Sequence, residues 1–288
     1  RSPSRHQQPP REMASSSSGS MLVGNELSDE EQQWMAQLSD LAKAEGLTIE
    51  TRFLLASYVI VAKGDMKKAL KRVRNYNKVV EQFKFNELTE EQTTAWLKKN
   101  MGNLVIRIGQ DKNGYEGYGF WLGALDPKVV ETEMDERLCV RAVGDNMRTL
   151  TPNIAAVRKG ACLLTDLTGV GWANLSVSLE KKMSSVYQDS YPFKMKKVYI
   201  VNPPSFFFAI LKLASLFIKQ KLIDRFCPVK AEALSEHFDT SSIPPRHGGT
   251  MSEDFWGARE MLLKQHHASV AEMEVTKGHG ELRGVVSM

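Results

Sequence analysis

The sequence predicts an α/β protein in which a helical N-terminal region precedes a mainly parallel β-sheet. Four amphipathic helix patterns fill the first hundred residues. Strand and helix patterns then alternate, which is the order that β-α-β units require. The strand expected at residues 160–167 is almost continuously apolar, as is typical of a parallel strand buried on both faces. At 288 residues the chain is long enough to bury a sizeable core.

The helices of the first hundred residues follow from apolar spacing and capping. Ser28 is suited to cap the first helix together with Glu31, three residues on, and helical spacing continues to Leu41. The same spacing predicts further helices at about residues 49–62, 66–83 and 90–99. We therefore expect a helical subdomain over residues 21–100. Residues 1–20 are rich in Ser, Pro and Gln, and we expect disorder or a cloning remnant there.

Strands and helices alternate after residue 100. Strands are expected at residues 104–108, 115–122, 160–167 and 198–201, the first two joined by a turn at Asp111–Gly114. Helices are expected at residues 129–150, 175–187, 205–218 and 253–267. These patterns predict a sheet domain over residues 101–251, followed by a C-terminal helix and a flexible tail over residues 252–288.

Positive charge is concentrated in one part of the chain. The net charge is only +4, but residues 181–230 contain ten Lys and Arg against two Asp, so this window is +8 and the remainder is −4. A local excess of this kind indicates a binding surface for an anionic partner more than general solubility.

The segment 205–218 is the most apolar helix pattern in the chain. Two interpretations remain open. A helix that is apolar around most of its circumference is usually buried in a core. Alternatively, it closes an apolar ligand cavity on one face and touches a bilayer with the other. The candidate lid and cavity residues are Phe206, Phe207, Ile210, Leu211, Leu213 and Phe217.

Cations stand on both sides of this segment. Lys194 and Lys196 precede the strand at 198–201, and Lys221 and Arg225 are four residues apart on the next expected helical segment, where they would share a face. The four side chains either form an ordinary solvated surface or converge into a cup for a phosphorylated headgroup.

Motifs of common enzyme classes are absent from the sequence. We find no Walker A loop, no Gly-x-Ser-x-Gly elbow and no cysteine followed by arginine at phosphate-loop spacing. The three cysteines lack metal-binding spacing, and the six histidines fall in expected tails and loops, where we expect them to be exposed. We therefore expect no enzyme activity, no metal and no cofactor apart from a lipid ligand.

The chain shows neither a signal peptide nor an apolar run long enough to cross a bilayer. The first 20 residues lack the charged-then-apolar order of a signal peptide, and the longest apolar run is about 14 residues against the roughly 20 needed. An odd number of cysteines favours a reducing compartment. We expect a cytoplasmic protein that is peripheral on intracellular membranes.

Several motifs together resemble the CRAL-TRIO lipid-binding superfamily over about residues 48–250. They are DKNG at 111–114 with LDP at 125–127, CLLTDLTG at 162–169, QDSYP at 188–192, VYIVN at 198–202 with Pro204, and IPPRHGGT at 243–250. The animal branch, which includes alpha-tocopherol transfer protein, cellular retinaldehyde-binding protein and the clavesins, is the more similar one. Phe193 stands where the fungal members carry a glutamate that contacts inositol.

The resemblance implies a CRAL-TRIO fold, in which the sheet is the floor of a hydrophobic cavity and residues 205–218 form a mobile gate helix. It also implies a non-enzymatic carrier or sensor of a hydrophobic small molecule, monomeric and without a nucleic-acid partner. Lys194, Lys196, Lys221 and Arg225 fall on the positions that bind a phosphatidylinositol bisphosphate headgroup in the animal branch. Leu55 and Ser57 replace arginines of that branch, which puts a headgroup contact from the N-terminal subdomain in doubt.

A second functional hypothesis remains open. The pocket could be vestigial in a trafficking module that recruits a protein partner through the C-terminal helix at about 253–267.

Overall fold

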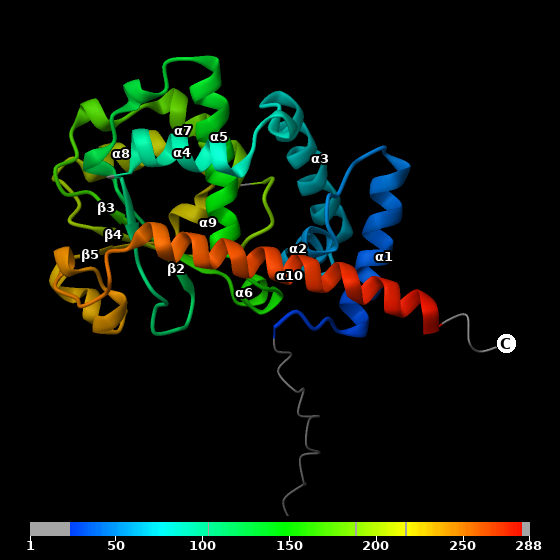
Figure 1. Ribbon diagram of the computed structural model, residues 1–288. Coiled ribbons are helices and arrows are strands. Elements are labelled where there is room, and N and C mark those ends of the chain that lie inside the picture. The colour runs from blue at the N-terminus through cyan, green and yellow to red at the C-terminus, as the bar shows by residue number, and fades with distance from the viewer. Residues whose placement is uncertain (1–23, 103, 188, 217, 284–288) are drawn as a thin grey trace, which may run out of the picture.

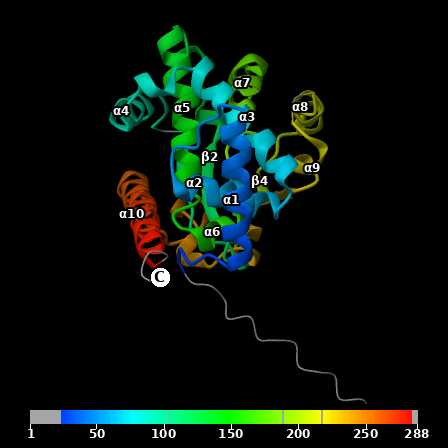
Figure 2. The same cartoon turned by 90° about the vertical axis from the view of Figure 1, so that its right-hand side faces the viewer.

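The computed structural model describes residues 24–102, 104–187, 189–216 and 218–283 (Figure 1). The segment 1–20, which we expect to be disordered, lies outside these residues. A group of N-terminal helices lies beside a β-sheet, further helices cover one face of that sheet, and a long C-terminal helix runs across the molecule (Figures 1 and 2).

The four N-terminal helices form where the sequence predicts them. They are α1 (Asp29–Ala44), α2 (Arg52–Ala62), α3 (Met66–Gln82) and α4 (Glu90–Met101). Ser28 and Glu31 make the expected capping box at the start of α1, with the Glu31 N–H donating to Ser28 Oγ at 3.2 Å. Contacts join α1, α2 and α3, whereas α4 packs on α5 (Glu133–Thr149) above the sheet.

The sheet has five strands in the order β1-β2-β3-β4-β5, and only the β1–β2 pair is antiparallel. The strands are β1 (Val105–Arg107), β2 (Glu116–Trp121), β3 (Ala161–Asp166), β4 (Met195–Val201) and β5 (Phe226–Val229). The edge strand β5 is not predicted from the sequence. It is only four residues long and contains an exposed proline, Pro228, which an edge strand tolerates and a central strand does not.

The two faces of the sheet have different partners because side chains alternate along each strand. Cys162, Leu164, Tyr199 and Val201 face a second core cluster that contains the loop residues Leu234, Phe238 and Ile243. The opposite face carries Leu163, Thr165, Val198 and Ile200, and it points toward α5 and α7 (Val177–Tyr187).

The helix expected over residues 205–218 is shorter than predicted. Asn202 takes a left-handed conformation with a φ of 51° at the end of β4, which asparagine tolerates better than most residues. After this turn, α8 covers only Phe207–Ala214 and α9 covers Gln220–Ile223. The Ser215 hydroxyl donates to the Lys212 carbonyl at 2.7 Å and so competes with continuation of α8.

The C-terminal helix α10 (Phe255–Arg283) is much longer than the predicted 253–267. It packs against α2 and α5, and its buried side chains recur at helical spacing well past residue 267. These buried residues are Phe255, Arg259, Leu263, His266, Ser269 and Met273. A short helix that the sequence did not predict, α6 (Ile154–Lys159), packs against α2.

The prediction that all histidines are exposed is wrong for His247 and His266. His266 is buried, its Nδ1 lies 2.9 Å from the Thr151 carbonyl, and its ring meets Phe53 edge-on at 4.7 Å. His247 is buried beside Asp166, 3.5 Å from the carboxylate. His266 is enclosed because α10 packs on the body of the protein, and His247 because its turn lies against the end of β3; local sequence indicates neither contact.

Candidate functional site: an apolar cavity with a cationic mouth

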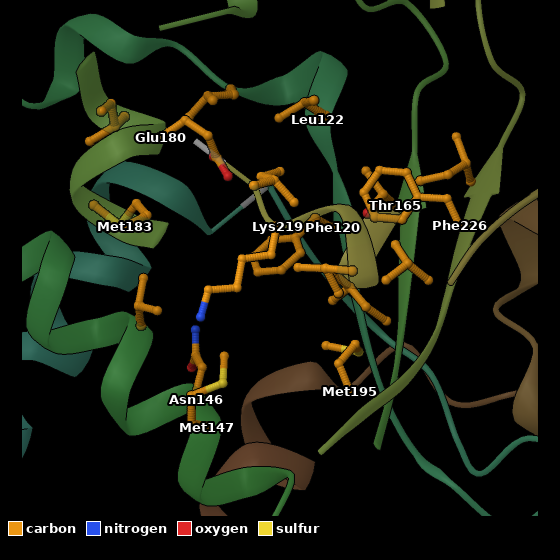
Figure 3. Close-up of a pocket in the computed structure, with 18 of the residues that line it drawn as sticks. Phe120, Leu122, Asn146, Met147, Thr165, Glu180, Met183, Met195, Lys219 and Phe226 are labelled. Carbon is orange, nitrogen blue, oxygen red and sulfur yellow. The ribbon is translucent and has the colours of Figure 1, made fainter. Parts of the chain in front are cut away.

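A cavity of about 710 Å³ lies between the sheet and the helices that cover it. Its floor consists of side chains that alternate along four strands, and Figure 3 shows several of them facing the helices. The floor residues are Phe120, Leu163, Thr165, Met195, Val198, Ile200 and Phe226. Because the walls are mainly aliphatic and aromatic, the cavity suits an apolar ligand.

The roof of the cavity comes from α4, α5, α7 and the lid helix α8. Leu97 and Met101 contribute from α4, and Leu179 and Met183 from α7. Residues of α5 make the largest contribution, at Cys139, Ala142, Val143, Asn146 and Met147.

The lid helix α8 presents different side chains inward and outward. Phe207 is buried and lines the cavity, and Leu213 also lines it, whereas Phe208 is 79% exposed. Phe206 stacks on Trp172 with ring centroids 5.1 Å apart, and Leu211 packs on the core cluster that contains Phe207. Of the other predicted lid residues, Ile210 lies in α8 but its side chain is not described, and Phe217 lies outside the described residues. Sequence reasoning therefore placed two side chains, Phe207 and Leu213, at the cavity wall.

Asn146 is a polar group held in a fixed orientation in the cavity wall. Its Nδ2 donates to the Tyr118 hydroxyl at 2.6 Å, and its Oδ1 accepts from Arg259 Nε at 3.2 Å. Arg259 reaches it from α10 and also donates to Thr94 Oγ1 at 3.0 Å. The C-terminal helix thus supports a side chain that faces the cavity (Figure 3).

Six cationic side chains line the mouth of the cavity, against two carboxylates. Three cations come from α3 and share one of its faces at i, i+3 and i+4 spacing. The others lie on the segment between the lid and β5. The cations are Lys68, Lys71, Arg72, Lys219, Lys221 and Arg225, and the carboxylates are Glu180 and Asp189.

Contacts to residues 189–195 hold several of these cations in place. Asp189 forms an ion pair with Lys219 and a second with Lys71, whose Nζ lies 3.9 Å from Oδ2. Arg72 Nη1 donates to the Tyr191 carbonyl at 3.3 Å. Arg225 Nη1 donates to the carbonyl of Met195. The α3 helix and the segment after the lid therefore approach the same stretch of chain.

The four predicted headgroup residues occupy different places. Lys221 and Arg225 line the cavity mouth, but Arg225 follows the end of α9 and is not on a helical face with Lys221. Lys194 donates to the Arg158 carbonyl at 3.2 Å, and Lys196 lies over the Tyr115 ring at 5.8 Å. Burial, with a smaller contribution from Lys196, lowers the pKa of Lys194 to about 8. In this structure the two pairs do not converge on the cavity.

Two of the three cysteines, Cys139 and Cys162, are buried and poorly suited to nucleophilic chemistry. Burial raises the pKa of Cys139, which lines the cavity, to about 12, and it also raises the pKa of Cys162. Within the described part of the chain, no group of three or more His, Cys, Asp or Glu could hold a metal ion.

An apolar patch is exposed around the lid. It includes Phe208 at 79%, Leu216 at 76% and Trp172 at 58% exposure, together with Val177 and Leu213. Large exposed apolar side chains that gather in one place usually mark an interaction surface. No helix among the described residues is long and apolar enough to cross a membrane.

Comparison with known proteins identifies the family. The CRAL/TRIO domain matches residues 100–249, which is just over half of the chain. The chain belongs to the CRAL/TRIO domain family. The predicted superfamily and fold class are confirmed: a CRAL/TRIO α/β fold with a mainly parallel sheet.

Curated relatives of this CRAL/TRIO chain match it over part of their length. Alpha-tocopherol transfer protein-like of Homo sapiens is 29% identical over 119 residues, 40% of this chain and 35% of the relative. Sec14 cytosolic factor of Schizosaccharomyces pombe is 28% identical over 152 residues, 48% of this chain and 53% of the relative. Tyrosine-protein phosphatase non-receptor type 9 of Homo sapiens is 29% identical over 97 residues, 34% of this chain and 16% of the relative. The chain thus spans about a sixth to a half of these proteins.

Among solved structures, the crystal structure of Sfh5 superposes with a TM-score of 0.47 at 13% identity, covering 79% of this chain and 89% of that one.

Sequence reasoning missed the α3 cations and Asn146. The spacing of Lys68, Lys71 and Arg72 on one helical face is visible in the sequence. This face borders the cavity because α3 packs beside residues 189–195. No local sequence pattern predicts that packing.

Proposed function

We propose that this CRAL/TRIO chain is a non-enzymatic lipid carrier that holds one hydrophobic molecule in its cavity. The observation that carries the proposal is the cavity of about 710 Å³, lined by apolar side chains and covered by α8. Its volume is within the roughly 300–1,000 Å³ of typical small-molecule sites. Burial of the passenger's apolar surface stabilises the complex by about 25 cal/mol per Å². The names of the tocopherol-transfer and Sec14 relatives are consistent with this role.

The same proposal assigns a membrane-docking role to the lid surface. The exposed apolar patch around Phe208 and Leu216 suits the acyl region of a bilayer. Lys221 and Arg225 lie beside it at the cavity mouth, where they can attract the anionic headgroup of a phosphoinositide. Contacts with the membrane would favour an open lid if the membrane binds the open state more tightly than the closed one. The protein would then act in the cytoplasm, peripherally on intracellular membranes.

The division of the chain at about residue 100 is part of this proposal. The family match begins there, and α1 to α3 form a helical group of their own. We assign the sheet domain to passenger binding and the helical subdomain to support of the cavity mouth.

Transfer of a fluorescent lipid between donor and acceptor vesicles tests the carrier role. The wild type is expected to accelerate transfer, and Ala142→Trp is expected to abolish the acceleration, because Ala142 is buried in the cavity wall and a tryptophan there occupies the passenger's space. Thr165→Trp fills the cavity from the sheet and gives an independent test if the first variant unfolds. Undiminished transfer by a folded, filled variant would rule out the carrier role of this cavity.

Flotation with vesicles that contain phosphatidylinositol bisphosphate tests the docking role. Lys221→Ala with Arg225→Ala is expected to weaken binding by about tenfold or more, since each loses a charge-assisted contact. Lys194→Ala with Lys196→Ala removes the same charge from side chains that contact Arg158 and Tyr115 instead. Equal loss in both pairs would favour the four-residue headgroup cup, and no loss in either would exclude headgroup docking through these residues.

A further inference from the structure

A buried arginine lies behind the cavity wall without a counter-ion. Arg259 of α10 is only 4% exposed, and it forms no ion pair among the described residues. Its Nε and Nη1 donate to neutral oxygens, Asn146 Oδ1 and Thr94 Oγ1, and its Nη2 has no hydrogen-bond partner in the described part of the chain. A buried guanidinium is costly unless acceptors or opposite charges compensate it. This part of the wall therefore carries more N–H donors than its own acceptors satisfy.

The contact with Arg259 fixes which atom of Asn146 is free to meet a ligand. Because Nε can only donate, the atom of Asn146 that faces it is the carbonyl oxygen. One N–H of the amide nitrogen donates to the Tyr118 hydroxyl at 2.6 Å, and the second finds no acceptor within the residues that the structure describes. Asn146 lines the cavity (Figure 3), so this second N–H is available to the passenger.

Tyr118 adds to the excess of donors. Burial raises the pKa of its hydroxyl, which therefore keeps its hydrogen. The oxygen accepts from Asn146, whereas its own hydrogen has no acceptor among the residues described. Hydrogen bonds in a chain polarise one another, so the cationic Arg259 makes the Asn146 amide a stronger donor. An acceptor oxygen is the group that would complete this network.

The other uncharged polar side chains of the wall show no such excess. They are Thr165, Asn174 and Ser176. The amide nitrogen of Asn174 donates to two backbone carbonyls, and Ser176 Oγ accepts from a backbone N–H of α7. The Thr165 hydroxyl can both donate and accept, so it selects for neither.

We propose that the passenger carries an oxygen that accepts a hydrogen bond from Asn146, and that Arg259 positions and polarises this donor. The ligand class is a hydrophobic molecule with a carbonyl or similar acceptor oxygen on its apolar body. A hydrocarbon segment at the same place would leave the buried donors unsatisfied. The inference rests on the proposed carrier function and adds a chemical requirement on the passenger.

Competitive loading of two neutral molecules of matched length tests this requirement. Delipidated protein is incubated with vesicles that contain equal amounts of 2-nonadecanone and nonadecane, and the bound molecules are extracted and quantified by gas chromatography. The ratio of bound ketone to bound hydrocarbon is compared between variants, so the partition of the two molecules in the membrane cancels.

Asn146→Asp turns the donor into an acceptor of nearly the same size. Its carboxylate can pair with Arg259 and accept from the Tyr118 hydroxyl, so the fold should be kept. The ratio of ketone to hydrocarbon in the wild type is expected to exceed that in Asn146→Asp by about tenfold.

Two controls remove polar groups at other places in the cavity. Thr165→Val removes a hydroxyl from the floor, and Lys221→Ala with Arg225→Ala removes two donors from the mouth. Both are expected to keep the wild-type ratio.

The infrared carbonyl stretch of isotope-labelled ketone reports the hydrogen bond itself. Its frequency in the wild type is expected to be lower than in hexane, and in Asn146→Asp it should return to the hexane value. Arg259→Met should give an intermediate frequency, because the amide remains but loses the cation that polarises it. If Arg259 were merely structural, Arg259→Met would change the amount of bound ketone and leave the frequency unchanged.

Each contrary outcome has a distinct meaning. Equal ratios in the wild type and in Asn146→Asp would overturn the inference and leave the carrier function standing. A preference for the ketone that is lost only in the Lys221 and Arg225 variant would place the acceptor at the mouth, and the inference would be wrong. If neither molecule loads, the inference fails, and the carrier function fails with it only if transfer of the fluorescent lipid is also absent. Should Asn146→Asp not fold, an unshifted carbonyl frequency in the wild type would still overturn the inference.

Discussion

Asn146 shows how one residue links the passenger site to the rest of the fold. It lines the cavity, yet both ends of its amide are engaged by buried groups, the Tyr118 hydroxyl and Arg259 Nε. The amide therefore has a fixed orientation, and its remaining hydrogen-bonding capacity is directed by α5 and α10 together.

Replacement of Asn146 by leucine should destabilise the protein. The variant leaves the buried Tyr118 hydroxyl without its partner and removes one of the two hydrogen bonds that the buried Arg259 guanidinium donates, so we expect the free energy of unfolding to fall by roughly 2–4 kcal/mol. Urea unfolding measures this change. Tyr118→Phe removes only one of the two contacts and should cost about 1–2 kcal/mol. Similar stability of Asn146→Leu and the wild type would show that this network contributes little.

His266 gives the protein a specific pH dependence. Burial is the largest cause of its pKa falling from 6.5 to about 4, and Arg148 and His267 lower it further, while Asp145 and the bond to the Thr151 carbonyl act in the opposite direction. Since the carbonyl only accepts, the neutral ring carries its hydrogen on Nδ1. The folded state thus favours the neutral ring.

The protein is expected to lose stability as the pH falls from 6.5 to 4. In this window the unfolded chain protonates His266 and the folded protein does not, so acid favours unfolding by up to roughly 3 kcal/mol from this residue. Above pH 6.5 the ring is neutral in both states and contributes no pH dependence. Urea unfolding at pH 7 and pH 4.5 should show a smaller decline in His266→Gln than in the wild type.

Phe53→Leu serves as the control for the His266 experiment. It disturbs the aromatic contact with the imidazole but keeps the titrating group. This variant should be less stable at both pH values and retain most of the acid-dependent decline. An equal decline in the wild type and in His266→Gln would contradict the assignment.

At the scale of elements, α8 and the residues next to it form part of the cavity wall on one side and an exposed apolar surface on the other. Phe207 faces the cavity while Phe208 and Leu216 face outward. Figure 2 shows that α8 and α9 lie on the opposite side of the molecule from α10. The docking role of the lid can therefore be tested without changing α10.

Phe208→Ser with Leu216→Ser is expected to weaken vesicle binding by at least about tenfold, because each apolar side chain contributes roughly 1.5–3 kcal/mol when it leaves water. Stability should change little because both residues are exposed. Met261→Ser with Val275→Ser removes two exposed apolar side chains from α10 and should leave vesicle binding intact. Comparable losses in both variants would show that binding is not specific to the lid.

The helix α10 contributes to the core. Phe255, Leu263 and Met273 are buried in the contacts it makes with the body of the protein. Recruitment of a protein partner through this helix, our second functional hypothesis, would have to use its exposed face. Deletion of residues 255–288 is expected to lower the free energy of unfolding by about 5 kcal/mol or more, measured by urea unfolding. A truncated protein of unchanged stability would show that α10 is a dispensable appendage.

For the whole molecule, the sequence predicts those features that depend on local signals. Ser28 with Glu31 marks the start of α1 correctly, and the apolar run 160–167 correctly indicates a strand that is central in a parallel sheet. Features that depend on how distant parts of the chain pack together were either not predicted or predicted wrongly. The strand β5 has only four residues and contains Pro228, so its sequence does not show a strand pattern. The helix α10 extends beyond its expected end because it packs on α2 and α5.

Only part of the candidate site was predicted from the sequence. Of the predicted lid residues, Phe207 and Leu213 line the cavity in this structure. The cationic mouth differs more, because four of its six cations, the three on α3 and Lys219, are not among the predicted site residues. The packing of α3 beside residues 189–195, which no local pattern indicates, brings the three α3 cations to the cavity.

Native mass spectrometry tests the central claim most directly, that the cavity holds a lipid. The protein purified from cells under gentle conditions is expected to show a second set of peaks, heavier by the mass of one lipid, that disappears in the folded Ala142→Trp variant. Tandem fragmentation then identifies the passenger and its headgroup. The account is contradicted if the wild type carries no lipid after purification and acquires none after incubation with neutral and anionic lipids, or if the filled variant carries the lipid equally well.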